Sequence, residues 1–348
     1  MRICTWAPTV FQGPQVVANK RRASHIPSGE DLTTATSGIV QRYEAMGVTD
    51  LLIAQRWWGN GEEIEASSLD CLAMTSFFGA CTSQMNMITA IHPGFFHPTV
   101  IAKWAATVQH LTGGRWAINV TSGWNMEEFD RYGIDPLEHD TRYVRSSEFI
   151  DILRLCWQQP VVDYHGRFYQ CRNLELMPAP KHPLEVFQGG QSPAAISMAA
   201  QKSDWMFLNG GSPERIEEIV SKVRSACADT QRQVRFAMYA APLCRSTDEA
   251  AWAEIDSMLA AVDPDLAAKR KARVHEGARG MWNEADPLSV LDTNEGYAPR
   301  FIGSPDTILQ RILQYQDLGI EMLHLDLRDA LFCQQVLPGL LQQGPLST

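Results

Sequence analysis

Short apolar runs alternate along this chain with longer segments whose apolar residues recur at helical spacing. Each run ends in polar or glycine-rich residues and is followed by one of the helix-like segments. Strands that alternate with helices in this way predict a parallel sheet with right-handed crossovers. Eight such runs favour an α/β fold of the closed (β/α)8 TIM-barrel type with insertions. The runs cover residues 2–7, 50–55, 85–91, 116–120, 184–187, 205–208, 234–243 and 323–327.

Two segments depart from this alternation. Residues 161–171 alternate around His165-Gly166, which predicts a β-hairpin outside the barrel. From about 261 to 300 the strand pattern stops, and a charged stretch gives way to a loop-like one. A long segment of this kind inside a compact domain is usually functional, so we expect an active-site lid there. We predict that residues 1–348 form one barrel domain that carries this insertion.

Composition narrows the class of protein. Hydrophobic residues make up 45% of the chain and charged residues 20%, which is enough apolar material for a large core. The formal net charge is −10, and the basic runs stop at Lys20-Arg21-Arg22 and Lys269-Arg270-Lys271, which excludes nucleic acid as a partner. The chain shows neither a signal pattern nor an apolar run of about 18 residues, so we expect a cytoplasmic protein without a membrane partner.

Cysteine and histidine usage gives no sign of a metal site. The 8 cysteines include no CxxC pair and are typical of small buried hydrophobes. His92, His97 and His139 match no zinc-ligand spacing, so we expect no metal. The chain also has no GxGxxG motif after its first strand and no GxSxG elbow, which disfavours a Rossmann domain and a serine hydrolase.

Polar residues follow the fourth predicted strand, at the end where barrel enzymes carry their active sites. Asn119 and Thr121 lie at the end of this strand, and Glu128 follows in an acidic loop. Two interpretations stay open for these groups. They either hydrogen-bond an aromatic ring system with alternating donors and acceptors, such as a flavin, or cap the loop backbone.

A glycine-rich turn offers a second candidate site. The Gly-Gly-Gln-Ser stretch at 189–192 lies between a predicted strand and a predicted helix, where backbone N–H groups attract phosphate. The alternative is a tight turn with Ser192 near the helix cap. Arg142 and Tyr143 begin another helix and either pair with the same phosphate or lie at the surface. Aromatic residues in strand-end loops suggest a ring-stacking pocket: Trp57, Trp58 and Trp124.

Several motifs together resemble the bacterial luciferase-like flavin monooxygenases. Within that family the chain is most similar to the FMNH2-dependent dimethylsulfone monooxygenases, with alkanesulfonate and pyrimidine monooxygenases as further relatives. The resemblance runs through nearly the whole chain. Its most specific stretches are LTGGRWAINVTSGW (111–124), LEHDTRYVRSSEF (137–149), EVFQGGQSPAA (185–195), SDWMFLNGGSPE (203–214) and FIGSP (301–305).

The resemblance implies a TIM barrel that binds FMN at the C-terminal ends of its strands. It implies that a separate NAD(P)H-dependent flavin reductase supplies FMNH2 and that O2 is the co-substrate, giving a flavin (hydro)peroxide of C4a or N5 type. It also implies a homodimer or homotetramer. Carried over by position, the flavin-contacting residues are Ala54, Gln55, Thr89, Asn119, Thr121 and Glu128, and those at the phosphate and ribityl end are Arg142, Tyr143, Gly190 and Ser192.

The same resemblance suggests where a small polar substrate, sulfone-like or heterocyclic, would react. Asn119 and Thr89 are candidates for positioning oxygen at the flavin. Arg56 and Arg328, and Arg300 once the lid closes, would bind an anionic or strongly polar oxygen-bearing group, or serve only as surface or structural cations. Substrate would lie above the ring among aromatic and histidine side chains: Trp6, Trp57, Trp58, His92 and Trp124.

Departures from the relatives lie in the substrate half. Where alkanesulfonate enzymes carry Arg and His on the seventh strand, this chain has Tyr239 and Ala241, and Ser67-Ser68 lies near the position of their loop Cys. We therefore do not expect a sulfonate held in the same way. Two alternative functions stay open: an oxidoreductase that uses the deazaflavin F420, and a barrel that binds flavin without catalysis.

Overall fold

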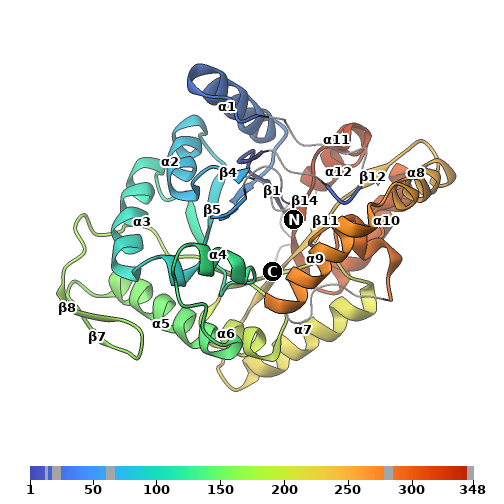
Figure 1. The fold of residues 1–348 in the computed structure, drawn as a ribbon. Helices are drawn as coiled ribbons and strands as arrows, with labels where there is room; N and C mark the ends of the chain where they lie inside the picture. Colours follow the sequence, from blue (N-terminus) through green and yellow to red (C-terminus); the bar gives the residue numbers. More distant parts are fainter. Residues whose placement is uncertain (12–14, 18–24, 60–66, 278–284, 343–348) are drawn as a thin grey trace.

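The computed structural model describes residues 1–11, 15–17, 25–59, 67–277 and 285–342. Within these residues, eight parallel strands close into a barrel in the order β1-β14-β11-β10-β9-β6-β5-β3, surrounded by helices (Figure 1). This confirms the predicted (β/α)8 barrel. The strands are β1 (Arg2–Trp6), β3 (Asp50–Ile53), β5 (Asn86–Ile91), β6 (Trp116–Val120), β9 (Val186–Gly189), β10 (Trp205–Leu208), β11 (Arg235–Ala240) and β14 (Ile320–Leu325).

Short capping signals start the helices that cover the barrel. Ser192, Ser212 and Ser304 each accept a backbone N–H with their side chain, and each is followed by a proline at the first helical position. These caps begin α6, α7 and α10. The long helices are α1 (Gly29–Ala45), α2 (Cys71–Cys81), α3 (Pro98–Thr112), α5 (His139–Gln158), α6 (Pro193–Lys202), α7 (Pro213–Ala228), α8 (Asp248–Ala260) and α10 (Pro305–Asp317).

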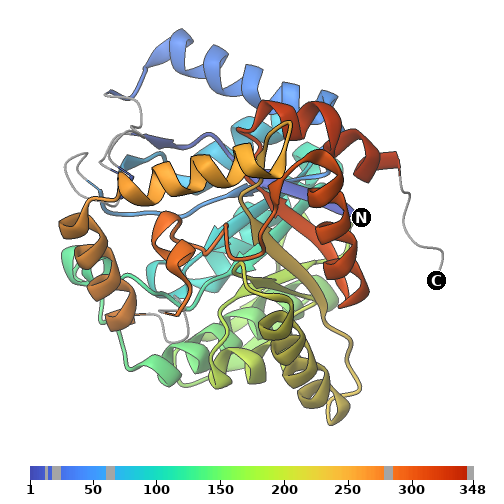
Figure 2. The same ribbon diagram turned by 90° about the vertical axis from the view of Figure 1, so that its right-hand side faces the viewer.

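The C-terminal helices α11 (Ala330–Gln335) and α12 (Leu337–Gln342) lie beside α1, so the two ends of the chain complete one ring (Figure 2). There Leu341 packs so closely on Gly47 that a Cβ at Gly47 would lie 2.9 Å from its Cδ1. The hairpin predicted at 161–171 is present as β7 (Val162–His165) and β8 (Gln170–Leu174). None of the described helices is long and apolar enough to span a membrane.

The seventh predicted strand is shorter than expected. Residues 234–243 divide into β11, which ends at Ala240, and β12 (Leu243–Cys244), which pairs with β13 (Ile302–Gly303) instead of the barrel. Pro242 lies between them and has no N–H to donate to the barrel ladder, which accounts for the break.

Strand register decides which side chains face the barrel interior. The inner cluster contains Cys4, Leu52, Ile88 and Ala117. Because strand side chains alternate between faces, the residues two positions further along also point inward, at the C-terminal end of the barrel. This last inward layer is formed by Trp6, Ala54, Ala90, Asn119, Gly189, Tyr239 and His324. The middle of the barrel interior is therefore apolar, and the layer at the C-terminal ends of the strands is polar and aromatic.

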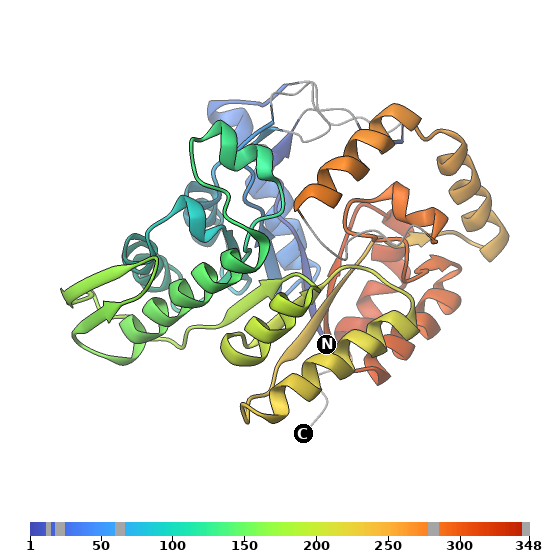
Figure 3. The same cartoon turned by 60° about the horizontal axis from the view of Figure 1, so that its bottom comes forward.

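Two further helices lie at the sides of this end: the short α4 (Met126–Arg131) and the longer α9 (Pro264–Gly277) (Figure 3). The segment predicted as a lid contains α9 and the 3-10 turn η2 (Pro287–Leu291), while residues 278–284 lie outside the described residues. Its later part is attached to the barrel. Gly210 N–H donates to Asn294 O at 2.9 Å, and Ala241 N–H donates to Gly296 O at 2.8 Å. The Glu295 carboxylate, fully buried, pairs with Arg215 at 3.1 Å.

Candidate active site

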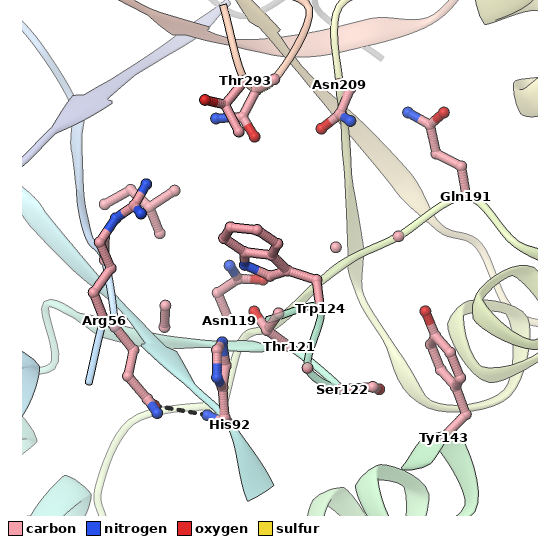
Figure 4. Close-up of a pocket in the computed structure, with 18 of the residues that line it drawn as sticks. Arg56, His92, Asn119, Thr121, Ser122, Trp124, Tyr143, Gln191, Asn209 and Thr293 are labelled. Carbon is pink, nitrogen blue, oxygen red and sulfur yellow. Dashed lines mark hydrogen bonds between the residues drawn. The ribbon is translucent and has the colours of Figure 1, made fainter. Parts of the chain in front are cut away.

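A cavity of about 200 Å³ opens at the C-terminal ends of the barrel strands (Figure 4). We call it the first cavity. It brings together residues from the ends of β3, β5, β6 and β9 and from the start of α5. Residues singled out from the sequence that line it are Trp6, Ala54, Gln55, Arg56, His92, Asn119, Thr121, Trp124, Tyr143 and Gly190. In Figure 4 the indole of Trp124 lies in the middle of this group.

Three buried polar side chains line the first cavity with atoms that lack a partner. The backbone N–H of His92 donates to Gln55 Oε1 at 2.8 Å, which leaves the amide nitrogen of Gln55 facing elsewhere. Within the described part of the chain, Gln55 Nε2, His92 Nδ1 and Asn119 Oδ1 are buried without a hydrogen bond. Each such group costs about 1–3 kcal/mol unless a ligand or water satisfies it. The cavity is therefore built to receive a group rich in donors and acceptors.

His92 is neutral at physiological pH. It is 3% exposed, and burial lowers its pKa to about 3, with the guanidinium groups of Arg145 and Arg56 acting in the same direction. A neutral imidazole can offer one donor and one acceptor but holds no proton to release near pH 7. Its role in the cavity is therefore hydrogen bonding, not proton transfer.

The other end of the first cavity has the geometry of an anion cradle. Gly190 has φ +111°, and a Cβ there would lie 2.8 Å from the Tyr143 hydroxyl oxygen. Ser192 caps α6 by accepting the Ala195 N–H at 3.3 Å and also hydrogen-bonds Tyr143. Burial raises the pKa of Tyr143, so its hydroxyl remains a donor. A left-handed glycine, a hydroxyl donor and a helix N-terminus together suit a phosphate.

Thr89 does not line the first cavity. Its register partner is Ile118, whereas Ala90 pairs with the inward-facing Asn119. The Thr89 side chain therefore points out of the barrel, where its hydroxyl bonds Thr75 Oγ1 at 2.8 Å and accepts the Trp116 indole N–H at 3.0 Å. Thr89 is therefore packed behind the barrel wall and does not reach the first cavity.

Glu128 and Arg142 also lie behind the cavity wall. The Glu128 carboxylate accepts the backbone N–H groups of Trp57 at 3.1 Å and Trp58 at 3.4 Å, so it positions the loop that carries Arg56. The Arg142 guanidinium is 3% exposed and is directed at the sulfur of Met126. Ser192, as the α6 cap, contacts the cradle only through Tyr143.

Trp57 and Trp58 pack away from the first cavity. The Trp57 ring stacks on Phe95 at 5.3 Å between centroids, and the Arg131 guanidinium lies 4.1 Å above the Trp58 ring. These contacts hold α4 against the strand-end loop. Of the predicted substrate-stacking tryptophans, the structure brings Trp6 and Trp124 to the cavity.

A second cavity of about 440 Å³ adjoins the first. The two share wall residues, among them Trp6, Arg56 and Thr293. Arg328 lines the second cavity, where its Nε bonds both carboxylate oxygens of Asp326 at 2.8 Å. Arg300 lines neither cavity: it bonds Asp286 at 2.8 Å and the carbonyl of Tyr297 at 3.0 Å, which ties η2 to the following turn.

Some lining residues were not among the sequence candidates. Asn209 directly follows β10, so the rule that found Asn119 at a strand end would also have found it. Gln191 lies within the predicted glycine-rich turn. Thr293 and Asn294 come from the segment without strand or helix periodicity, and no local signal marks them. His139 lines the cavity beside Tyr143, with their ring centroids 5.3 Å apart.

These residues fit a flavin mononucleotide. Unpartnered amide atoms at Gln55 and Asn119 suit the polar edge of an isoalloxazine ring, and the Gly190–Tyr143 cradle suits the phosphate. The fit rests on the donors and acceptors that line the cavity.

Comparisons with known proteins agree with this geometry. A dimethylsulfone monooxygenase of Pseudomonas fluorescens (strain Pf0-1), FMNH2-dependent, is 35% identical over 350 residues, covering 97% of this chain and 94% of the relative. An enzyme of the same name from Pseudomonas putida is 36% identical over 273 residues, covering 74% of this chain and 75% of the relative.

The fold is shared with solved structures. The crystal structure of a riboflavin lyase with modified FMN and riboflavin superposes with a TM-score of 0.78 at 17% identity, covering 100% of this chain and 92% of that one.

The family model described as luciferase-like monooxygenase matches residues 11–322. These matches confirm the resemblance carried by the sequence motifs. The chain belongs to the luciferase-like monooxygenase family.

Proposed function

We propose that this protein is a two-component monooxygenase that uses FMNH2 and O2 to oxygenate a small, polar organic substrate. A separate NAD(P)H-dependent flavin reductase supplies the FMNH2. The observation that carries the proposal is the set of buried, unpartnered amide and imidazole atoms in a cavity that ends in an anion cradle. The relatives named FMNH2-dependent dimethylsulfone monooxygenases support it.

Bound FMNH2 supplies the two electrons with which O2 is activated. The chain's own residues bind and orient it. Gln55 Nε2 and Asn119 Oδ1 offer a donor and an acceptor to the ring, and the N-terminus of α6 with Tyr143 holds the phosphate. Trp6 and Trp124 exclude water from the space above the ring, since both line the first cavity.

Closure of the site would fall to α9. Residues 285–300 are attached to the barrel through Glu295, Asn294 and Gly296, so they suit a fixed wall. The helix α9 contributes Arg270 to the second cavity. A lid role for the 261–300 segment is therefore proposed for its α9 portion.

Location and assembly belong to the same proposal. We expect a cytoplasmic homodimer or homotetramer. Val100 and Leu111 are 59% and 70% exposed on α3, and their separation of three helical turns puts them on one face, which supports association through barrel helices. Light scattering coupled to gel filtration measures the mass of the particle directly.

Stopped-flow absorbance tests the proposed function. The anaerobic mixture of protein and FMNH2 is combined with oxygenated buffer, with and without dimethylsulfone, and flavin reoxidation is followed beside free FMNH2. We expect reoxidation to be slower than in free solution and to depend on the sulfone. Absence of FMNH2 binding in an anaerobic titration would refute the proposal, and binding of reduced F420 in its place would establish the alternative cofactor. Binding of FMNH2 with no oxygen-dependent product would favour the non-catalytic alternative.

A further inference from the structure

We propose that the second cavity holds the substrate and that this substrate is an uncharged sulfone with an alkyl or aryl group much larger than methyl. The inference rests on the proposed function, because it assigns the substrate of the same site. Four features of the second cavity carry it: its position, its volume, the apolar side chains in its wall and the arginines that already have partners.

The position follows from the wall that the two cavities share. Trp6, Arg56 and Thr293 line both. Trp6 belongs to the last inward layer of the barrel and contacts His324 with ring centroids 4.3 Å apart, so this part of the wall is held by packing. A ligand in the second cavity would therefore lie directly beside a ring bound in the first.

The volume is too large for dimethylsulfone. The second cavity measures about 440 Å³, within the range of about 300–1,000 Å³ typical of pockets for drug-sized molecules. A sulfonyl group with two methyl groups would fill only a small part of it, whereas a larger molecule would contact more of its wall. The natural occupant is therefore a bulkier molecule.

Apolar side chains form part of the wall of the second cavity. Val16, Val17, Leu291 and Leu327 line it, with exposures of 1%, 3%, 8% and 8%. Val10 of β2 (Val10–Phe11) lines it as well. These side chains offer hydrocarbon contact to a chain or ring, and each methylene buried there favours binding.

The arginines of the second cavity already have partners. Three arginines and two aspartates line it, namely Arg56, Arg270, Arg328, Asp292 and Asp326, and each of the three arginines makes an interaction within the protein. The Arg328 guanidinium is bonded to Asp326. Burial raises the pKa of Asp292, and the positive charge of Arg270, which is 6% exposed, acts weakly in the opposite direction.

Asp292 is also hydrogen-bonded. It accepts the Tyr239 hydroxyl at 3.3 Å and the backbone N–H groups of Asn294 at 2.9 Å and Gly296 at 3.3 Å. An anionic substrate would have to compete with two carboxylates that already face the arginines, and burying its charge would be costly. An uncharged polar group avoids that cost.

Hydroxyl donors are available for such a group. Tyr297 lines the second cavity and makes no side-chain hydrogen bond to any residue in the described part of the chain. Tyr43 also lines the cavity, and its hydroxyl likewise makes no hydrogen bond to any described residue. Burial raises the pKa of both tyrosines, so each remains a donor at neutral pH. Sulfonyl oxygens are acceptors without charge and match two such donors.

A binding series on the cofactor-free protein tests the inference independently of turnover. Calorimetry measures the Kd of methyl n-alkyl sulfones from dimethylsulfone to methyl octyl sulfone. We expect the Kd to fall about threefold per added methylene over the first several carbons. Octanesulfonate, an anion of the same length, should bind at least about tenfold more weakly than methyl octyl sulfone. A flat series, or tighter binding of the sulfonate, would overturn the inference.

Variants locate the binding. Val10→Phe and Leu327→Phe fill the apolar side and should abolish the gain from chain length while dimethylsulfone binding is retained. Val161→Phe, at a 42% exposed position just before β7, is the matched control and should leave the series unchanged. A series that persists in both cavity variants would place the alkyl group elsewhere and reject the assignment.

The same sulfones in the coupled assay separate this inference from the proposed function. Coupled FMNH2 consumption that rises with alkyl length supports both. Turnover of dimethylsulfone with no gain for longer sulfones rejects the inference alone. Absence of FMNH2 binding rejects the proposed function, while the calorimetric series still decides the inference about the second cavity.

Discussion

The backbone N–H of His92 donates to the side-chain oxygen of Gln55 at 2.8 Å, across the ends of the neighbouring strands β5 and β3. A backbone N–H can only donate, so its partner must be the amide oxygen, and the NH2 end of Gln55 is the one left for a ligand. The main chain of one strand thereby sets which hydrogen-bonding group its neighbour presents.

This relationship predicts the effect of Gln55→Glu. The carboxylate still accepts the His92 N–H and keeps the side-chain volume, but it has no donor for the flavin. We expect the affinity for FMNH2, measured by anaerobic fluorescence titration, to fall about tenfold. Thermal unfolding of the cofactor-free variant should stay close to that of the parent protein. An unchanged flavin affinity would show that Gln55 Nε2 does not contact the ring.

Asn119 and Thr89 form a matched pair on neighbouring strands, one facing the cavity and the other facing out. Asn119→Ala should leave FMNH2 binding measurable but lower product formed per FMNH2 consumed several-fold, with hydrogen peroxide released instead. Thr89→Val removes the hydroxyl bonded to Thr75 and Trp116 and should cost about 1–2 kcal/mol of stability without a change in coupling. Equal coupling in both variants would contradict the role of Asn119.

The position of Tyr143 leads us to expect that it favours a flavin with a phosphate over one without. Tyr143→Phe removes the hydroxyl beside Gly190 and keeps the ring. We expect the affinity for reduced FMN to fall about tenfold while the affinity for reduced riboflavin, which lacks the phosphate, stays unchanged. Parallel titrations with the two flavins measure this. An equal loss for both would mean that Tyr143 contacts the ring or ribityl chain and not the phosphate.

His92 predicts a loss of stability in acid. Burial lowers its folded pKa to about 3, below the unfolded value near 6.5. Above pH 6.5 neither state is protonated and the group has no effect. As pH falls below 6.5 the unfolded chain gains a proton that the folded protein cannot, so stability is lost progressively toward pH 3. By pH 5 the loss is about 2 kcal/mol.

Urea unfolding of the parent protein and of His92→Asn at pH 7 and pH 5 isolates this effect. His324 has the same lowered pKa of about 3 but is present in both proteins, so its contribution cancels. The variant should lose less stability between the two pH values. Identical losses would mean that His92 is protonated in the folded state.

Arg115 lies at the N-terminal end of β6, at the opposite end of the barrel from the site, and we expect it to contribute to stability alone. Its guanidinium donates to Thr112 O at 2.9 Å, Met85 O at 2.7 Å and Gly79 O at 3.0 Å, as well as to Thr82. Arg115→Lys cannot reproduce this planar set and should lower the free energy of unfolding by about 2 kcal/mol. Flavin affinity should be unaffected, and Arg172→Lys, at an exposed position, is the control for the charge-conserving change.

Local patterns were sufficient for the elements and for part of the site. Apolar runs and helix caps depend on neighbouring residues, which is why the barrel could be predicted. Asn119 lies near the end of a strand, Thr121 and Gly190 directly follow strands, and they were found for that reason. The direction in which the Thr89 side chain points could not be predicted. A strand with apolar residues on both faces does not reveal which face points inward until its register with a neighbouring strand is known.

The sequence by itself determined the order of strands and helices, the strand-end positions of the polar residues and the family of the chain. Only the tertiary structure decided what those residues face. Tyr239 meets Asp292, and Trp6 lies between two cavities, because the barrel closes and brings residues distant in sequence to one end. Such contacts arise from strand register and from the path of a segment without periodicity, and neither is encoded in the spacing of neighbouring residues.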